Sequence, residues 1–214
     1  MIYIPIGCQC TGAGVLKDYN IRTNSFPFDW ILSNPESIYK ILILLLIDNM
    51  NIKELVSLHF FKCEQKATFD VAEHYYFDND GKALCNTKYN LIFPHDTNDS
   101  ETINKYIRRF QRLKDTILHS TEELVFLYIS QSSLNEGNFT INGRAIVLNT
   151  YFYIEKINEL LNQVRPNLPF KILFYTSCVE NYDIKDTKII LRPLNSQDIW
   201  FKLIPEILKT LLQS

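Results

Sequence analysis

Short apolar runs alternate with amphipathic segments along the chain, and this alternation is clearest in the second half. The runs over 124–129 and 171–175 are continuously apolar, which is typical of strands buried on both faces. Between them, residues 151–164 repeat their apolar side chains at helical spacing. Such alternation is typical of a parallel sheet covered by helices. We therefore predict one α/β domain over residues 1–214, with a mostly parallel sheet, helices on both faces and a small β-hairpin insertion.

The remaining elements are predicted from local start and stop signals. Residues 2–6 form a short apolar strand. Pro35 follows Ser33 and Asn34, either of which can cap a helix that opens with proline. The turn sequence at 78–81 separates strand-like residues and predicts the hairpin. We also expect helices over 11–19, 52–58 and 196–212, a helix that begins at Asp99 or Ser100, and a strand over 188–191.

Composition and charge exclude several classes of protein. Hydrophobic residues make up 46% of the chain and charged residues 21%, so the chain can build a sizeable core. The net charge of −2 provides no overall field for nucleic acid or anionic lipid. The most apolar run, 38–47, has about half the length of a membrane span. We therefore expect neither a nucleic-acid partner nor a membrane span.

The cysteines indicate a reducing compartment. Their number is odd, and a domain of this size does not need disulfides. The first residues lack the basic segment of a signal peptide, so we expect a cytoplasmic location. The spacing of the cysteines matches no common metal site, and we expect no metal and no cofactor. The five cysteines are Cys8, Cys10, Cys63, Cys85 and Cys178.

Cys10 is the first candidate for chemistry. It lies where the first predicted strand has ended and a helix begins. Ligands of parallel α/β sheets bind at the carboxyl ends of the strands, and a helix N-terminus lowers the pKa of a thiol. A thiolate there suits nucleophilic catalysis, with backbone N–H groups of the turn binding an oxyanion. The alternative is that Cys8 and Cys10 are small apolar side chains packed against the sheet.

His95 and two aspartates are the second group of candidates. His95 lies in a predicted loop between Pro94 and Asp96, where an imidazole can act as a general base. Asp96 can orient an imidazole or cap the following helix. Asp29 lies between Phe28 and Trp30, so we expect it to be partly desolvated and paired. It can orient a catalytic histidine or hold a loop.

The other polar residues provide weaker candidates. Arg108, Arg109 and Arg112 share the polar side of a predicted helix, which is typical of a solvated face, with phosphate contact as the alternative. The other three histidines lack the spacing of metal ligands. They are His59, His74 and His119.

Several of these segments together resemble a family described as putative papain-like cysteine peptidases. The resemblance rests on Gly7 to Cys10, on Pro27-Phe28-Asp29-Trp30 and on Phe93-Pro94-His95-Asp96, which occur in the family's order. Lys88-Tyr89 and Arg108-Arg109 extend it, so that it covers about residues 4–130.

The resemblance implies roles for individual residues. Cys10 matches the family's cysteine, Asp29 its Pro-Phe-Asp-Trp aspartate, and His95 with Asp96 its His-Asp pair. Gln9 stands where the family has asparagine, so an amide next to the nucleophile remains available as an oxyanion donor. The order of cysteine before histidine is shared with papain-like enzymes, whereas the predicted α/β sheet differs from the two-lobed papain layout.

Two classes of function follow from these observations. In the first, the protein is a thiol hydrolase or acyl transferase in which Cys10, His95 and Asp29 or Asp96 act together on a peptide, an isopeptide or an acylated glycan or small molecule. In the second, it is a non-catalytic module that binds a ligand or protein. A third option is a carbohydrate-related accessory protein that binds sugar phosphate through Arg108 or Arg109. The sequence leaves the oligomeric state open.

Overall fold

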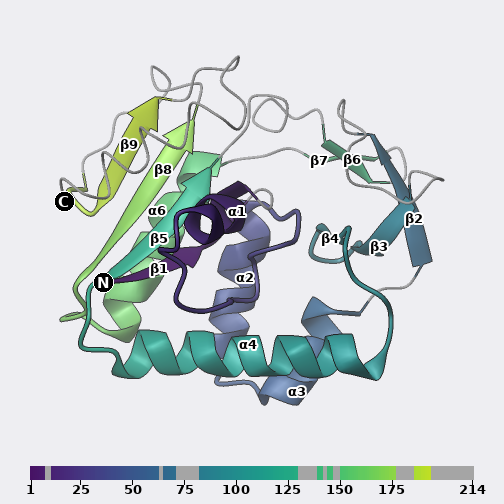
Figure 1. Ribbon diagram of the computed structural model, residues 1–214, viewed down its shortest axis with the longest axis horizontal. Helices are drawn as coiled ribbons and strands as arrows, with labels where there is room; N and C mark the ends of the chain where they lie inside the picture. Colours follow the sequence, from purple (N-terminus) through teal and green to yellow (C-terminus); the bar gives the residue numbers. More distant parts are fainter. Residues whose placement is uncertain are drawn as a thin grey trace.

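The computed structural model contains a parallel sheet and a separate antiparallel sheet (Figure 1). Their arrangement confirms the predicted α/β class with a mostly parallel sheet. The structure describes residues 1–7, 11–62, 65–70, 82–129, 139–141, 144–146, 150–176 and 186–193.

The parallel sheet has the strand order β1-β5-β8-β9, and all three strand pairs in it are parallel. The ends of all four strands agree with the predicted ones to within two residues. The strands are β1 (Ile2–Pro5), β5 (Leu124–Ile129), β8 (Phe170–Thr176) and β9 (Ile189–Pro193). Because neighbouring strands run in the same direction, their carboxyl ends meet at one edge of the sheet, which we call the carboxyl edge.

Helices cover both faces of this sheet, and β5 shows why. Its residues are all buried, and alternate side chains enter two different cores. Phe126 and Tyr128 pack with α2 (Pro35–Leu46), α4 (Ser100–His119) and α6 (Thr150–Val164). Val125, Leu127 and Ile129 face the other way, toward Val15 and Leu16 of α1 (Thr11–Asp18).

The antiparallel sheet is larger than the predicted hairpin. Its strand order is β4-β3-β2-β6-β7, and it lies on the side of α1 and α2 away from the parallel sheet (Figure 1). β2 pairs with β3 as a hairpin would, but the turn predicted at 78–81 lies outside the described residues. The strands are β2 (Gln65–Asp70), β3 (Lys82–Asn86), β4 (Leu91–Phe93), β6 (Phe139–Ile141) and β7 (Arg144–Ile146).

The predicted helix starts agree with the structure. Asn34 caps α2 by accepting a hydrogen bond from the Ser37 N–H at 2.8 Å, and Asp99 caps α4 in the same way. The segment predicted as a helix over 52–58 is α3 (Ile52–Glu54), which continues as a π-helical turn η1 (Leu55–Phe60). The helix predicted over 196–212 lies outside the described residues. None of the described helices has the length and apolar character needed to cross a membrane.

Candidate functional site

The segment that carries the candidate nucleophile connects β1 to α1. Ile6 still donates a backbone hydrogen bond to Leu127 at 2.9 Å, so the chain follows β5 beyond the end of β1. Gly7 then lies against the ring of Tyr128, where a Cβ atom would come within 2.3 Å of a ring carbon. Residues 8–10, which include Gln9 and Cys10, lie outside the described residues. The backbone therefore reaches this segment at the carboxyl edge and leaves it in the first turn of α1.

Two further helices begin at the same edge. α6 leads directly into the first residue of β8, which lies at the opposite edge, so the start of α6 lies toward the carboxyl edge. The start of α2 lies beside that of α6, because Tyr39 and Tyr153, each about one turn from its helix start, have ring centroids 5.9 Å apart. Around these two starts, the buried Ser33 Oγ, Asn34 Nδ2 and Thr150 Oγ1 have no hydrogen-bond partner in the described part of the chain. Unpaired buried polar atoms are rare in folded proteins, and these three lie beside the starts of the two helices.

A backbone bridge joins the two motif-bearing segments. Leu32 and Ile92 exchange hydrogen bonds of 2.9 and 3.0 Å in an antiparallel bridge. In addition, the Ser37 hydroxyl donates to the carbonyl of Tyr89. The Pro-Phe-Asp-Trp segment before Leu32 and the Phe-Pro-His-Asp segment after Ile92 therefore lie next to each other, beside the start of α2.

His95 lies at the surface in the loop between β4 and α4. The neighbouring carboxylate of Asp96 is nearly buried, with 4% of its side chain exposed. One of its oxygens accepts from the Lys105 ammonium group and the other from the Tyr106 hydroxyl. Asp96 therefore ties the His95 loop to α4, and the helix cap that it could have supplied comes from Asp99.

Asp29 is fully buried and paired, as its position between aromatic residues predicts. Its Oδ2 accepts from the Arg22 guanidinium group and, at 2.9 Å, from the Phe26 N–H. Burial raises the pKa of Asp29 above its ordinary value, while Arg22, the Phe26 N–H and Arg109 act in the opposite direction. Its Oδ1 has no hydrogen-bond partner among the described residues.

Arg22 is the residue that the sequence-based reasoning missed. Its guanidinium group also donates to Ser25 Oγ at 2.8 Å and to the Asn24 carbonyl at 3.2 Å. The same Ser25 offers its carbonyl to Arg112 at 2.6 Å. The only signal in the sequence was that a desolvated Asp29 requires a cationic partner, and this requirement does not identify Arg22 among the cationic residues of the chain.

The described residues contain no group of three or more histidine, cysteine or acidic side chains that could hold a metal ion. Cys85 of β3 is buried, and its thiol lies 3.4 Å from the Ala83 carbonyl.

Comparison with protein-family models identifies the relatives of the chain. Neither the comparison with curated proteins nor that with solved structures returned a match. A model of a family described as "putative papain-like cysteine peptidase" matches residues 1–178, which include the β1–α1 connection, the Asp29 segment and the His95 loop. The chain therefore belongs to this putative papain-like cysteine peptidase family.

Proposed function

We propose that the protein is a cysteine-dependent hydrolase or acyl transferase in which Cys10 is the nucleophile. The observation that carries this proposal is that α1 begins at Thr11, directly after Cys10 and at the carboxyl edge of the sheet. The positive end of a helix favours the thiolate over the thiol, and the thiolate is the reactive form. Membership of the family supports the same assignment.

The proposed reaction proceeds through an acyl-enzyme. His95 accepts the Cys10 proton as the sulfur attacks a carbonyl carbon, and the oxygen becomes an oxyanion. Gln9 and backbone N–H groups of the β1–α1 connection stabilise that oxyanion. The carbon–nitrogen or carbon–oxygen bond then breaks, and the leaving group takes the proton from His95. Water, or an acceptor nucleophile, next loses a proton to His95, attacks the thioester and releases the acyl group together with the Cys10 thiol.

The two aspartates have different proposed parts in this reaction. Both oxygens of Asp96 already accept hydrogen bonds from α4, so we assign it the positioning of the His95 loop. Asp29 keeps Oδ1 without a partner in the described part of the chain, and its segment lies beside that of His95. We therefore assign Asp29 the orientation of the imidazole, for which the exposed His95 ring has to turn inward.

The proposed substrates are peptides, isopeptides or acylated glycans and small molecules. All contain a carbonyl carbon that the Cys10 thiolate can attack. The reaction requires a reduced thiol, which agrees with the cytoplasmic location proposed from the sequence.

Hydrolysis of p-nitrophenyl acetate tests this proposal, because an activated ester reports any acyl-enzyme. We expect a burst of p-nitrophenol equal to the protein concentration and an acetyl group on Cys10 in the mass spectrum. Cys10→Ser and His95→Gln should remove the burst. His119→Gln is the matched control, since His119 is also exposed but lies at the far end of α4. A burst that survives Cys10→Ser contradicts the proposal, because another residue is then the nucleophile, and the absence of a burst in the wild type favours a non-catalytic binding module.

A further inference from the structure

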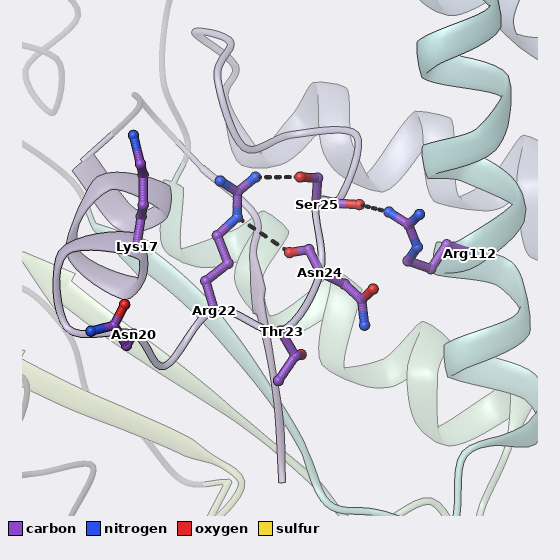
Figure 2. Close-up of a pocket in the computed structure, with 7 residues that line it drawn as sticks. All are labelled: Lys17, Asn20, Arg22, Thr23, Asn24, Ser25 and Arg112. Carbon is purple, nitrogen blue, oxygen red and sulfur yellow. Dashed lines mark hydrogen bonds between the residues drawn. The ribbon is translucent and has the colours of Figure 1, made fainter.

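A polar pocket lies at the other end of α1 from Cys10. It has a volume of about 520 Å³ and is open to solvent, between the end of α1, the loop that follows it and the middle of α4 (Figure 2). Lys17 belongs to the last turn of α1, whereas Cys10 precedes its first turn. The eight residues of α1 rise about 12 Å. The pocket therefore does not belong to the site described above.

Three cationic side chains line this pocket: Lys17, Arg22 and Arg112. The other lining residues carry amides or hydroxyls, and no acidic side chain lines the pocket in the part of the chain that the structure describes. This concentration of positive charge contrasts with the net charge of −2 for the whole chain. A concave surface lined by charges of one sign attracts ligands of the opposite sign.

The two arginines are held in place before any ligand arrives. In Figure 2 they approach Ser25 from opposite sides, Arg22 through the hydroxyl at 2.8 Å and Arg112 through the carbonyl at 2.6 Å. Arg22 is further fixed by the buried Asp29 and lies over the Trp30 ring, 5.4 Å from its centroid. Preorganised guanidinium groups lose little side-chain entropy on binding a phosphate.

Donors remain for a ligand after these contacts are made. The hydrogen bonds of Arg22 use Nε and Nη2, and that of Arg112 uses Nη1. Arg22 Nη1, Arg112 Nη2 and Lys17 Nζ thus have no hydrogen-bond partner within the described ranges. Guanidinium and ammonium groups are the side chains that bind phosphate oxygens most strongly.

The rest of the lining indicates what the phosphate is attached to. Asn20, Thr23 and Asn24 offer amides and a hydroxyl, which pair with ligand hydroxyl groups. None of the lining residues that the structure describes is aromatic, so they provide no stacking surface of the kind that a nucleobase uses. We propose that this pocket, which we call the basic pocket, binds a phosphorylated sugar, whose phosphate and hydroxyl oxygens are shared among Lys17, Arg22 and Arg112 and the asparagines and threonine of the lining.

Isothermal titration calorimetry of the full chain with glucose 6-phosphate tests this proposal. We expect saturable binding with a dissociation constant of about 1 mM or lower, and weaker binding of inorganic phosphate and of AMP. Lys17→Gln and Arg112→Gln should each weaken binding about tenfold, the effect of one charge-assisted hydrogen bond. Circular dichroism melting of each variant checks that it is folded.

Arg108→Gln is the matched control, because Arg108 is exposed on the same helix, does not line the basic pocket and loses the same charge. It should change the affinity less than twofold. No saturable binding, or equal weakening by Arg108→Gln, would overturn the site. Equal or tighter binding of inorganic phosphate or AMP would overturn the assignment to a sugar phosphate. The proposal does not depend on Cys10, and Cys10→Ser should leave the affinity unchanged.

Discussion

The buried carboxylate of Asp29 forms an ion pair with the guanidinium of Arg22, which lies seven residues earlier in the chain. The pair fixes the connection from α1 to α2 and links two parts of the molecule. On one side it anchors the Pro-Phe-Asp-Trp segment, which the Leu32–Ile92 bridge places beside the His95 loop, and on the other it orients a lining residue of the basic pocket.

Removal of one partner of this pair should destabilise the fold strongly. Asp29→Ala leaves Arg22 without its carboxylate while 13% of the arginine side chain is exposed, and we expect a loss of about 3 kcal/mol in the free energy of unfolding. The Glu36–Lys40 pair provides the contrast, because both of its side chains are more exposed. Glu36→Gln should cost at most about 0.5 kcal/mol. Urea denaturation measures both, and equal losses would contradict the assignment.

Replacement of two glycines near Cys10 by alanine should change the stability of the fold in opposite directions. At Gly7 a Cβ would collide with the buried Tyr128 ring, so Gly7→Ala should destabilise the fold by about 1–3 kcal/mol. At Gly12, within α1, the nearest atoms lie at an ordinary 3.6 Å. Gly12→Ala should therefore stabilise the helix by about 0.5–1 kcal/mol. Thermal melting compares the two variants, and a neutral Gly7→Ala would show that the ring can move aside.

His59 should make stability depend on pH. Burial, together with the charges of Lys88 and Lys62, lowers the pKa of His59 below its ordinary 6.5, and its Nδ1 lies 2.9 Å from the Tyr89 hydroxyl. As pH falls through 6.5, the unfolded chain therefore binds a proton more readily than the folded one, and stability decreases. His59→Gln should reduce this decrease in urea titrations at pH values on both sides of 6.5. The same dependence in wild type and variant would assign it to other groups.

The anchor of the His95 loop can be tested at Tyr106. Tyr106→Phe keeps the buried ring but removes the hydroxyl that donates to Asp96, and we expect it to cost about 1–3 kcal/mol of stability. If Asp96 positions His95, the variant should also lower the rate of p-nitrophenyl acetate hydrolysis with little change in KM. Tyr89→Phe loses a hydroxyl contact of 2.9 Å to His59 and serves as the control, with its turnover unchanged. Equal turnover in wild type and Tyr106→Phe would leave Asp96 a structural role only.

Local sequence patterns predicted the elements that are defined by their own apolar spacing or by a capping residue within the element. The apolar runs of β5 and β8 and the Asn34 cap of α2 are signals of this kind. The short strands β6 and β7 were not predicted, because three residues carry too little periodicity. The sequence over 89–93 is strand-like throughout, but β4 begins only at Leu91, because the turn before it places Asn90 at a positive φ of 51°.

In the candidate site, too, features set by neighbouring residues could be predicted and features set by tertiary contacts could not. The desolvation of Asp29 follows from its neighbours Phe28 and Trp30, which are adjacent in sequence. Other contacts could not be predicted, because they depend on the tertiary structure and no local spacing encodes them. They are the ion pair of Asp29 with Arg22, the hydrogen bond of Arg112 to Ser25 and the hydrogen bonds of α4 to Asp96. Arg112 therefore looked like part of a solvated helix face, although it lines the basic pocket.

The central claim, a reactive thiolate at Cys10, is tested most directly by the pH dependence of its alkylation. Iodoacetamide labelling followed by mass spectrometry should be done in the Cys8→Ser variant, so that one thiol remains in the β1–α1 connection. We predict an apparent pKa for Cys10 well below the free-thiol value of about 8.5, and much slower labelling of the buried Cys85. His95→Gln should raise that apparent pKa, whereas His119→Gln should not. An apparent pKa of about 8.5 or above, or labelling of Cys10 no faster than that of Cys85, would contradict the account.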